Sequence, residues 1–337
     1  MKKLLVCVAA LGMLFTSCMR DETRLDEGSI VTFKISAPAV STRAAIEDTY
    51  GTGVAADDLH WAIFEADENG AAVGDAIFSN VEEGFFADDA LENTFNVRLV
   101  KGKKYVGMFW AQANGAPYTV AWPEVTMGEV NSNDEDLDAF FNIHNFSITA
   151  GQETGEQKVE LRRPFAQVNV AIPEEDFNAA AAAGLTLSEV GVKVSAANTL
   201  NVYTGLVGED TDITYTQNGD AITEGLTATI NTKQYMVISF NYVLVDGDAW
   251  SHESDEGEEL KDVTIYYGDG NETLSQTINN VPIERNHRTY IVGSLLSETV
   301  DFQIEILPDW EDPTYNADCY WVNENDLQDK KDITATI

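Results

Sequence analysis

The sequence is poor in cysteine. Only three of its 337 residues are cysteine, Cys7, Cys18 and Cys319. The first two fall in an N-terminal segment typical of export, which leaves one thiol in the body of the chain. The mature protein therefore has no pair of cysteines for an intramolecular disulfide, and a cysteine-based metal site would need several other ligands.

Basic residues are also scarce, at 20 Lys and Arg against 57 Asp and Glu, which gives a formal net charge of −37. This balance excludes a nucleic-acid partner, because neutralising phosphates requires clustered Lys and Arg. It equally disfavours binding to an anionic membrane through a basic patch. The chain is still 44% hydrophobic and 10% aromatic, so it can bury cores and wholesale disorder is excluded.

Recognisable catalytic motifs are missing. The four histidines, His60, His144, His252 and His287, are widely spaced, and no His-Glu-x-x-His, Gly-x-Ser-x-Gly or P-loop pattern occurs. We therefore expect a protein that is not an enzyme and that carries no cofactor and no metal.

One acidic stretch, from Asp246 to Glu259, is dense enough in carboxylates to attract Ca²⁺. Its spacing does not match an EF-hand, because Trp250 stands at the fifth loop position and Ser251 where glycine is required. A solvated loop is the simpler interpretation. Trp250 and Trp321 could stack on sugars, or serve as ordinary core and edge residues.

The N-terminus indicates export with a lipid anchor. Met1-Lys2-Lys3 precedes an apolar run, 4–15, that is typical of a signal peptide and shorter than the roughly 20 residues of a membrane span. The run ends Leu-Phe-Thr-Ser-Cys, which resembles a bacterial lipobox. We expect cleavage before Cys18 and fatty acylation of that cysteine, with palmitate-type chains as the anchor. The alternative is ordinary signal-peptidase cleavage nearby, with Cys18 as a bystander.

The four residues after Cys18, 19–22 (Met-Arg-Asp-Glu), resemble the short signal that directs Bacteroidetes lipoproteins to the outer face of the outer membrane. We therefore expect a lipid-anchored protein at the cell surface. Removal of residues 1–17 takes away Lys2 and Lys3, so the mature charge becomes −39.

The body of the chain reads as all-β. Apolar and polar residues alternate with period two in several segments bounded by Gly, Asn and Asp clusters. The clearest of these predicted strands are 31–35, 95–99, 158–162, 190–194 and 300–306. Only two short segments, 134–141 and 174–183, are predicted to be helical.

A faint internal echo links 104–109 with 234–240, since both are buried-strand patterns led by tyrosine. The echo favours two similar sandwiches with a boundary near Ile172. The expected division begins with a signal peptide (1–17) and a lipidated segment that carries the first strand (18–43). An N-terminal sandwich (44–172), completed by strand 30–36, a C-terminal sandwich (173–310) and an acidic tail (311–337) follow.

Four motifs, in this order, resemble those of the fimbrillin-like lipoproteins of Bacteroidales, which include the subunits of type V pili. The first is Val-Thr-Phe-Lys-Ile-Ser followed by Ser-Thr-Arg-Ala, within 31–44, and the second is Lys-Gly-Lys-Lys-Tyr at 101–105. The third is Leu-Arg-Arg-Pro-Phe-Ala-Gln-Val-Asn at 161–169, and the fourth is Val-Pro-Ile-Glu-Arg-Asn-His-Arg-Thr-Tyr at 281–290. The chain is most similar to a subgroup whose function is poorly defined.

The resemblance implies two tandem transthyretin-like β-sandwiches and proteolytic processing after an arginine. Here the cut would fall between Arg43 and Ala44 and would release the strand that carries Val31, Phe33 and Ile35. The loss would uncover an apolar groove that a strand of another fimbrillin-like subunit could fill. The alternative is that Arg43 is an exposed linker residue that no specific protease cuts.

Two functions remain from the sequence. One is a structural or accessory subunit of a pilus, assembled by processing and donor-strand exchange, that supports adhesion. The other is a monomeric outer-membrane lipoprotein that binds glycans or host proteins. The alternating C-terminal residues Ile333, Ala335 and Ile337 would suit a short donor strand but do not decide between them.

Overall fold

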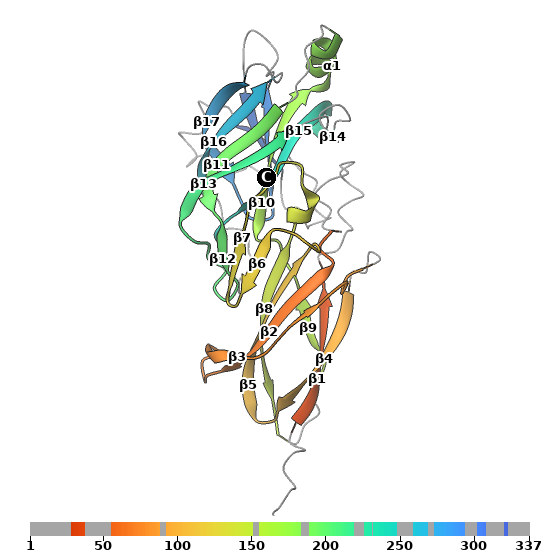
Figure 1. The fold of residues 1–337 in the computed structure, drawn as a ribbon, viewed down its shortest axis with the longest axis vertical. Helices are drawn as coiled ribbons and strands as arrows, with labels where there is room; N and C mark the ends of the chain where they lie inside the picture. The colour runs from red at the N-terminus through yellow and green to blue at the C-terminus, as the bar shows by residue number, and fades with distance from the viewer. Residues whose placement is uncertain are drawn as a thin grey trace, which may run out of the picture.

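The protein folds almost entirely as β-strands, as expected (Figure 1). The structure, a computed structural model, describes residues 28–37, 55–87, 92–150, 155–182, 189–218, 226–230, 232–247, 259–268, 273–293, 302–307 and 320–322. None of the helices in these ranges is long and apolar enough to cross a membrane.

The N-terminal half is a sandwich of two sheets. The first sheet has the order β4-β1-β9 and the second β3-β2-β5-β8. A small third sheet, β12-β7-β6, adjoins them. The strands are β1 (Gly28–Ser36), β2 (Asp58–Ala66), β3 (Ala72–Glu82), β4 (Glu92–Val100), β5 (Lys103–Gln112), β6 (Tyr118–Ala121), β7 (Glu124–Met127), β8 (Phe140–Ile148), β9 (Gln157–Glu160) and β12 (Thr199–Asn201).

The C-terminal half contains ten hydrogen-bonded strands along the path β17-β16-β11-β15-β10-β18-β19-β20, with β13 on β11 and β14 on β15. These strands are β10 (Phe165–Pro173), β11 (Glu189–Ala197), β13 (Asp210–Asn218), β14 (Leu226–Ile230), β15 (Lys233–Leu244), β16 (Glu259–Gly268), β17 (Thr273–Ile283), β18 (Arg288–Gly293), β19 (Phe302–Leu307) and β20 (Tyr320–Val322).

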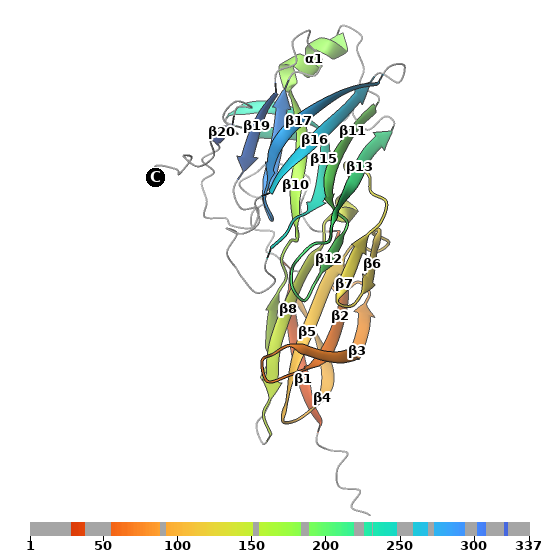
Figure 2. The ribbon, with the colours of Figure 1, turned by 90° about the vertical axis from the view of Figure 1, so that its left-hand side faces the viewer.

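This path folds over on itself, because only one residue pair, Ala197 with Leu244, joins β11 to β15. The strands on either side of that joint face each other across a shared core (Figure 2). The Tyr215 hydroxyl of β13 donates to the Tyr242 carbonyl of β15 at 2.5 Å, and the Thr289 hydroxyl of β18 donates to the Pro282 carbonyl of β17 at 2.7 Å. The C-terminal half is therefore also built in two layers.

One apolar core runs through both halves. It contains one face of β2, β5 and β8 together with the buried faces of β10, β11 and β15. A buried ion pair reinforces the junction, where the Arg163 guanidinium donates to both carboxylate oxygens of Asp138 at 2.9–3.1 Å and lies 4.8 Å above the Phe140 ring. Burial raises the pKa of Asp138, and Arg163 opposes that rise. The two halves therefore share one continuous interior.

The period-two segments are confirmed as strands. Residues 31–35 lie in β1, 95–99 in β4 and 190–194 in β11, while 158–160 lie in β9 and 302–306 in β19. The two echoing segments are confirmed as strands: 104–109 lies in β5 and 234–240 in β15, one in each half. In the helical segment 174–183, α1 spans Glu174–Ala182.

The helix expected over 134–141 is wrong beyond a single turn. A 3-10 turn, Glu135–Leu137, is capped by the Asp134 carboxylate, and the chain is extended again at Asp138. β8 then begins at Phe140. The buried pairing of Asp138 with Arg163 explains the break, since it draws Asp138 out of helical geometry and into the junction.

The boundary expected at Ile172–Pro173 falls at the end of β10 and not between the two sheet systems. β10 pairs with β15 and β18, so residues 165–172 belong to the C-terminal sheet. The chain passes from one half to the other between β9 and β10, and β12 later returns to pair with β7.

Two buried asparagines on adjacent strands provide a matched test of this packing. Asn169 and Asn241 are both fully buried, but the Asn169 amide has no hydrogen-bond partner among the described residues. The Asn241 amide donates to the Val168 carbonyl at 3.0 Å and accepts from Ser132 at 2.8 Å. We expect Asn169→Leu to raise the free energy of unfolding by about 1 kcal/mol and Asn241→Leu to lower it by about 1–3 kcal/mol, because only the second change removes satisfied bonds.

Urea denaturation of the two variants beside the parent chain measures both changes. Equal losses of stability in the two variants would contradict this account of the Asn169 environment.

Candidate functional site

The strand singled out by the sequence, β1, is the middle strand of its sheet. It pairs antiparallel with β4 along its whole length, from Gly28 opposite Val100 to Ser36 opposite Glu92. On its other side it pairs parallel with β9, over Phe33–Ser36. A strand held on both sides contributes two rows of backbone hydrogen bonds to its sheet.

The inward face of β1 fills the centre of the N-terminal sandwich. Val31, Phe33 and Ile35 are each 0% exposed. The Phe33 ring lies 5.2 Å from that of Phe95 on the same sheet, and 5.6 Å and 5.2 Å from Phe109 and Phe146 on the opposite sheet. Phe33 therefore joins the two sheets through one aromatic cluster.

The outward face of β1 is polar and is tied to the same neighbours. The Thr32 hydroxyl donates to the Asn96 side chain at 2.7 Å, and Lys34 forms a 2.6 Å ion pair with Glu92. The Ser36 carbonyl accepts from the Leu161 amide at 2.8 Å. These contacts fix the register of β1 against β4 and β9.

β1 is also the first strand among the described residues, and the next one, β2, lies in the opposite sheet. A cut in the connection between them would separate β1 covalently from the other described strands. Cys18, Arg43 and Ala44 lie outside the described residues, as do the tail residues Ile333, Ala335 and Ile337 and the residues Trp250 and Cys319.

The other sequence candidates occupy structural positions where they are described. Asp246 and Glu259, which flank the acidic stretch, are used locally: the Asp246 carboxylate accepts from the Val207 amide at 2.7 Å, and Glu259 pairs with Lys261 at 2.5 Å. No group of three or more His, Cys, Asp or Glu side chains that could hold a metal occurs in the described ranges.

The third and fourth sequence motifs meet in space. The third motif, 161–169, runs into β10 and the fourth, 281–290, runs into β18, and these two strands are adjacent and parallel, with Gln167 opposite Arg288. Arg163 makes the junction ion pair, and Arg285 donates to the Val245 and Gly205 carbonyls while lying 5.4 Å from the Phe141 ring centre. These motifs therefore build the junction between the halves, a role that sequence spacing alone did not indicate.

A family model matches residues 24–330, and the chain belongs to that family, which is described as a family of unknown function (DUF6562). A search of curated proteins found no match.

Several solved structures are similar to most of this chain at low sequence identity. One is a candidate polysaccharide-binding protein (DUF1812) from Bacteroides thetaiotaomicron, at 13% identity and TM-score 0.49, covering 88% of this chain and 99% of that one. A fimbrial assembly protein from Parabacteroides distasonis has 14% identity and TM-score 0.45, with coverages of 82% and 95%. The fimbrial anchor protein Mfa2 from Porphyromonas gingivalis has 13% identity and TM-score 0.44, with coverages of 83% and 97%.

The central position of Phe33 generates a prediction. Phe33→Ala should lower the free energy of unfolding by about 3–5 kcal/mol, because it leaves a cavity within the aromatic cluster. Ile30→Ala on the same strand is the matched control, since Ile30 is 57% exposed and its truncation should change stability by about 0.5 kcal/mol or less. Chemical denaturation of both variants measures the difference, and a similar small loss in each would show that β1 is not a structural strand of this core.

Proposed function

We propose that this chain is a surface lipoprotein that serves as a structural or accessory subunit of a type V-like pilus and so supports adhesion. In this proposal Cys18 carries the lipid anchor at the outer membrane, and a protease cuts between Arg43 and Ala44. β1 then leaves, and a strand of another fimbrillin-like subunit takes its place. The two halves correspond to the tandem transthyretin-like domains that the sequence resemblance implies.

The observation that carries the proposal is the position of β1. It is a central strand with a fully buried inward face, yet it is the first of the described strands and precedes the expected cut. A cut after Arg43 would therefore sever one complete strand, at the middle of a sheet, from the chain that carries all the other described strands.

The burial of β1 determines how much free energy an incoming strand must supply when it replaces β1. Burying the side chains of Val31, Phe33 and Ile35 contributes about 1.5–3 kcal/mol each, or roughly 5–9 kcal/mol together. A cut alone would leave β1 seated most of the time. An incoming strand must bury a similar apolar surface, and it must run in the direction of β1, antiparallel to β4 and parallel to β9.

The net charge of the subunit also affects assembly. The segment 18–43 contains four basic and four acidic residues, so its removal leaves the subunit at the mature charge of −39. Subunits this acidic repel one another, and salt screens that repulsion over about 10 Å at 0.1 M. Added salt should therefore favour assembly of the cut form.

An arginine-specific protease tests the processing step on the purified native protein. We expect one limited cut that gives a new N-terminus at Ala44, followed by SDS-resistant oligomers that form more readily at higher salt. Arg43→Gln is the matched control and should remain uncut and monomeric. A cut protein that keeps its monomeric size at all salt concentrations would contradict strand exchange and favour the stand-alone binding lipoprotein.

Metabolic labelling with a radioactive fatty acid tests the anchor. We expect label on the parent chain and its loss in Cys18→Ala, because acylation needs that thiol. Cys319→Ala is the control and should keep the label. Label retained in Cys18→Ala would exclude the lipobox interpretation.

A further inference from the structure

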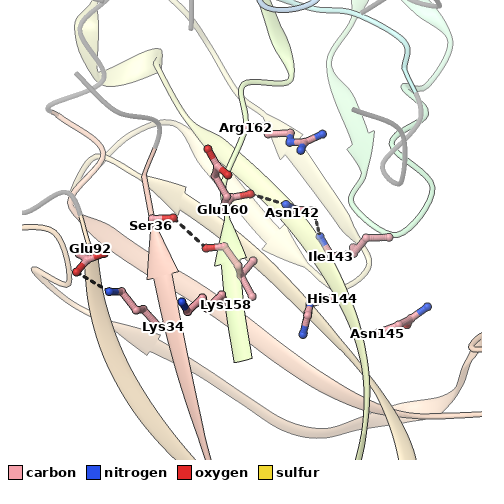
Figure 3. Close-up of a pocket in the computed structure, with 11 residues that line it drawn as sticks. Lys34, Ser36, Glu92, Asn142, Ile143, His144, Asn145, Lys158, Glu160 and Arg162 are labelled. Atoms are coloured by element: carbon pink, nitrogen blue, oxygen red, sulfur yellow. Dashed lines mark hydrogen bonds and ion pairs between the residues drawn. The ribbon is translucent and has the colours of Figure 1, made fainter. Parts of the chain in front are cut away.

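A pocket that includes residues of β1 lies at an open seam of the N-terminal sandwich. β9 is the edge strand of one sheet and β8 the edge strand of the other. A cavity of about 780 Å³ lies at this seam and is lined by residues of four strands, β1, β4, β8 and β9, and by Arg162, which follows β9 (Figure 3). This volume falls within the range of small-molecule sites.

Basic residues outnumber acidic residues in this pocket, whereas acidic residues outnumber basic residues in the whole chain. Lys34, Lys158 and Arg162 line it together with only two acids, Glu92 and Glu160. The whole chain has 57 acids and 20 bases, so a pocket with more bases than acids stands out from its surroundings. Within the described residues Lys158 has no carboxylate partner, and its side chain is exposed. A local excess of positive charge attracts an anionic ligand and orients it.

The remaining lining groups favour a ligand with hydroxyls as well as a negative charge. The Glu160 and Glu92 carboxylates can accept hydrogen bonds from hydroxyl groups, whereas they would repel a simple anion such as phosphate. His144, whose Nε2 lies 3.0 Å from the Gln157 Oε1, adds a ring nitrogen. A carboxylate, a ring nitrogen and cations together match a carboxylated sugar.

We propose that this pocket, formed by β1, β4, β8 and β9, binds a short acidic oligosaccharide of the uronic-acid class. The sugar carboxylate pairs with Lys158 beside Arg162, since Lys34 is already ion-paired with Glu92. The sugar hydroxyls bond to the Glu160 carboxylate and the His144 ring.

The pocket also depends on β1 being in place, a consequence that rests on the proposed function. Lys34 and Ser36 of β1 line it, and β9 is held in its sheet by its parallel pairing with β1. A ligand that binds only the form with β1 seated stabilises that form by mass action. At a ligand concentration ten times its Kd, the fraction of cut protein that has released β1 should therefore fall about tenfold.

Calorimetric titration of the uncut protein with trigalacturonate at low ionic strength tests the site. Fully methyl-esterified trigalacturonate is the control ligand, because it keeps the sugar rings and lacks the charge. We expect binding of the acid and at least tenfold weaker binding of the ester. Equal binding of both, or no binding of the acid at millimolar concentration, would overturn the proposal.

A matched pair of variants locates the site. Lys158→Gln should weaken trigalacturonate binding about fivefold, since it removes one charge-assisted contact. Lys104→Gln, an exposed lysine on β5 outside the pocket, should leave the affinity unchanged. Because both side chains are exposed, both variants should unfold at the parent's temperature. Equal weakening in the two would show binding to general charge and overturn this site.

The coupling to β1 is measured separately, by release of residues 18–43 from the Arg43-cut protein with and without trigalacturonate. Slower release with the sugar supports the dependence on β1. Binding to the uncut chain without any effect on release would overturn the coupling and leave the sugar site standing. Failure of strand exchange in the absence of sugar would count against the proposed function alone.

Discussion

The N-terminal half depends on one interaction: the packing of Phe33 and its neighbours on β1 between two sheets that the rest of the chain provides. Val31, Phe33 and Ile35 pack into the apolar core of this sandwich, and β4 and β9 pair with the backbone of β1 on either side. The inward side chains of this strand are thus fully buried in the sandwich, and the strand also precedes the expected cleavage point. Stability and the proposed assembly depend on the same nine residues.

The second sheet of that sandwich, β3-β2-β5-β8, contributes to both apolar cores. One face of β5 packs on β1 and β4 in the first core, and the other face packs into the core that extends to β10 and β15. The adjacent residues Phe140 and Phe141 on β8 follow this division, since each belongs to a different core. A change in the occupancy of β1 would therefore act on one face of a sheet whose other face supports the C-terminal half.

Strands with one buried face could be predicted from the sequence, because their side chains alternate between core and solvent. β1, β4 and β11 are of this kind. β5 and β10 are buried on both faces and lack alternation, so the sequence indicated buried strands but not which half they belong to. This is why the expected boundary at Ile172 was placed after β10 although β10 pairs with β15 and β18.

The inward residues of β1 were also predictable, whereas the seam pocket was not. Its lining residues come from strands far apart in sequence, and Lys34, His144 and Lys158 form no motif along the chain. The helix expected over 134–141 stops after one turn for a related reason, because the partner that ends it, Arg163, lies 25 residues from Asp138. Contacts of this range follow from the topology and leave no local pattern.

A reversible lock on β1 tests the central claim most directly. Thr32 and Asn96 are opposite each other on β1 and β4 and their side chains touch, so cysteines at these positions meet the geometry of a disulfide. In a soluble chain that begins at Met19 and carries Cys319→Ala, the oxidised Thr32→Cys, Asn96→Cys protein is cut after Arg43 and then reduced. The account predicts a monomer that retains β1 until reduction and SDS-resistant oligomers afterwards. Equal oligomer formation before and after reduction would contradict it.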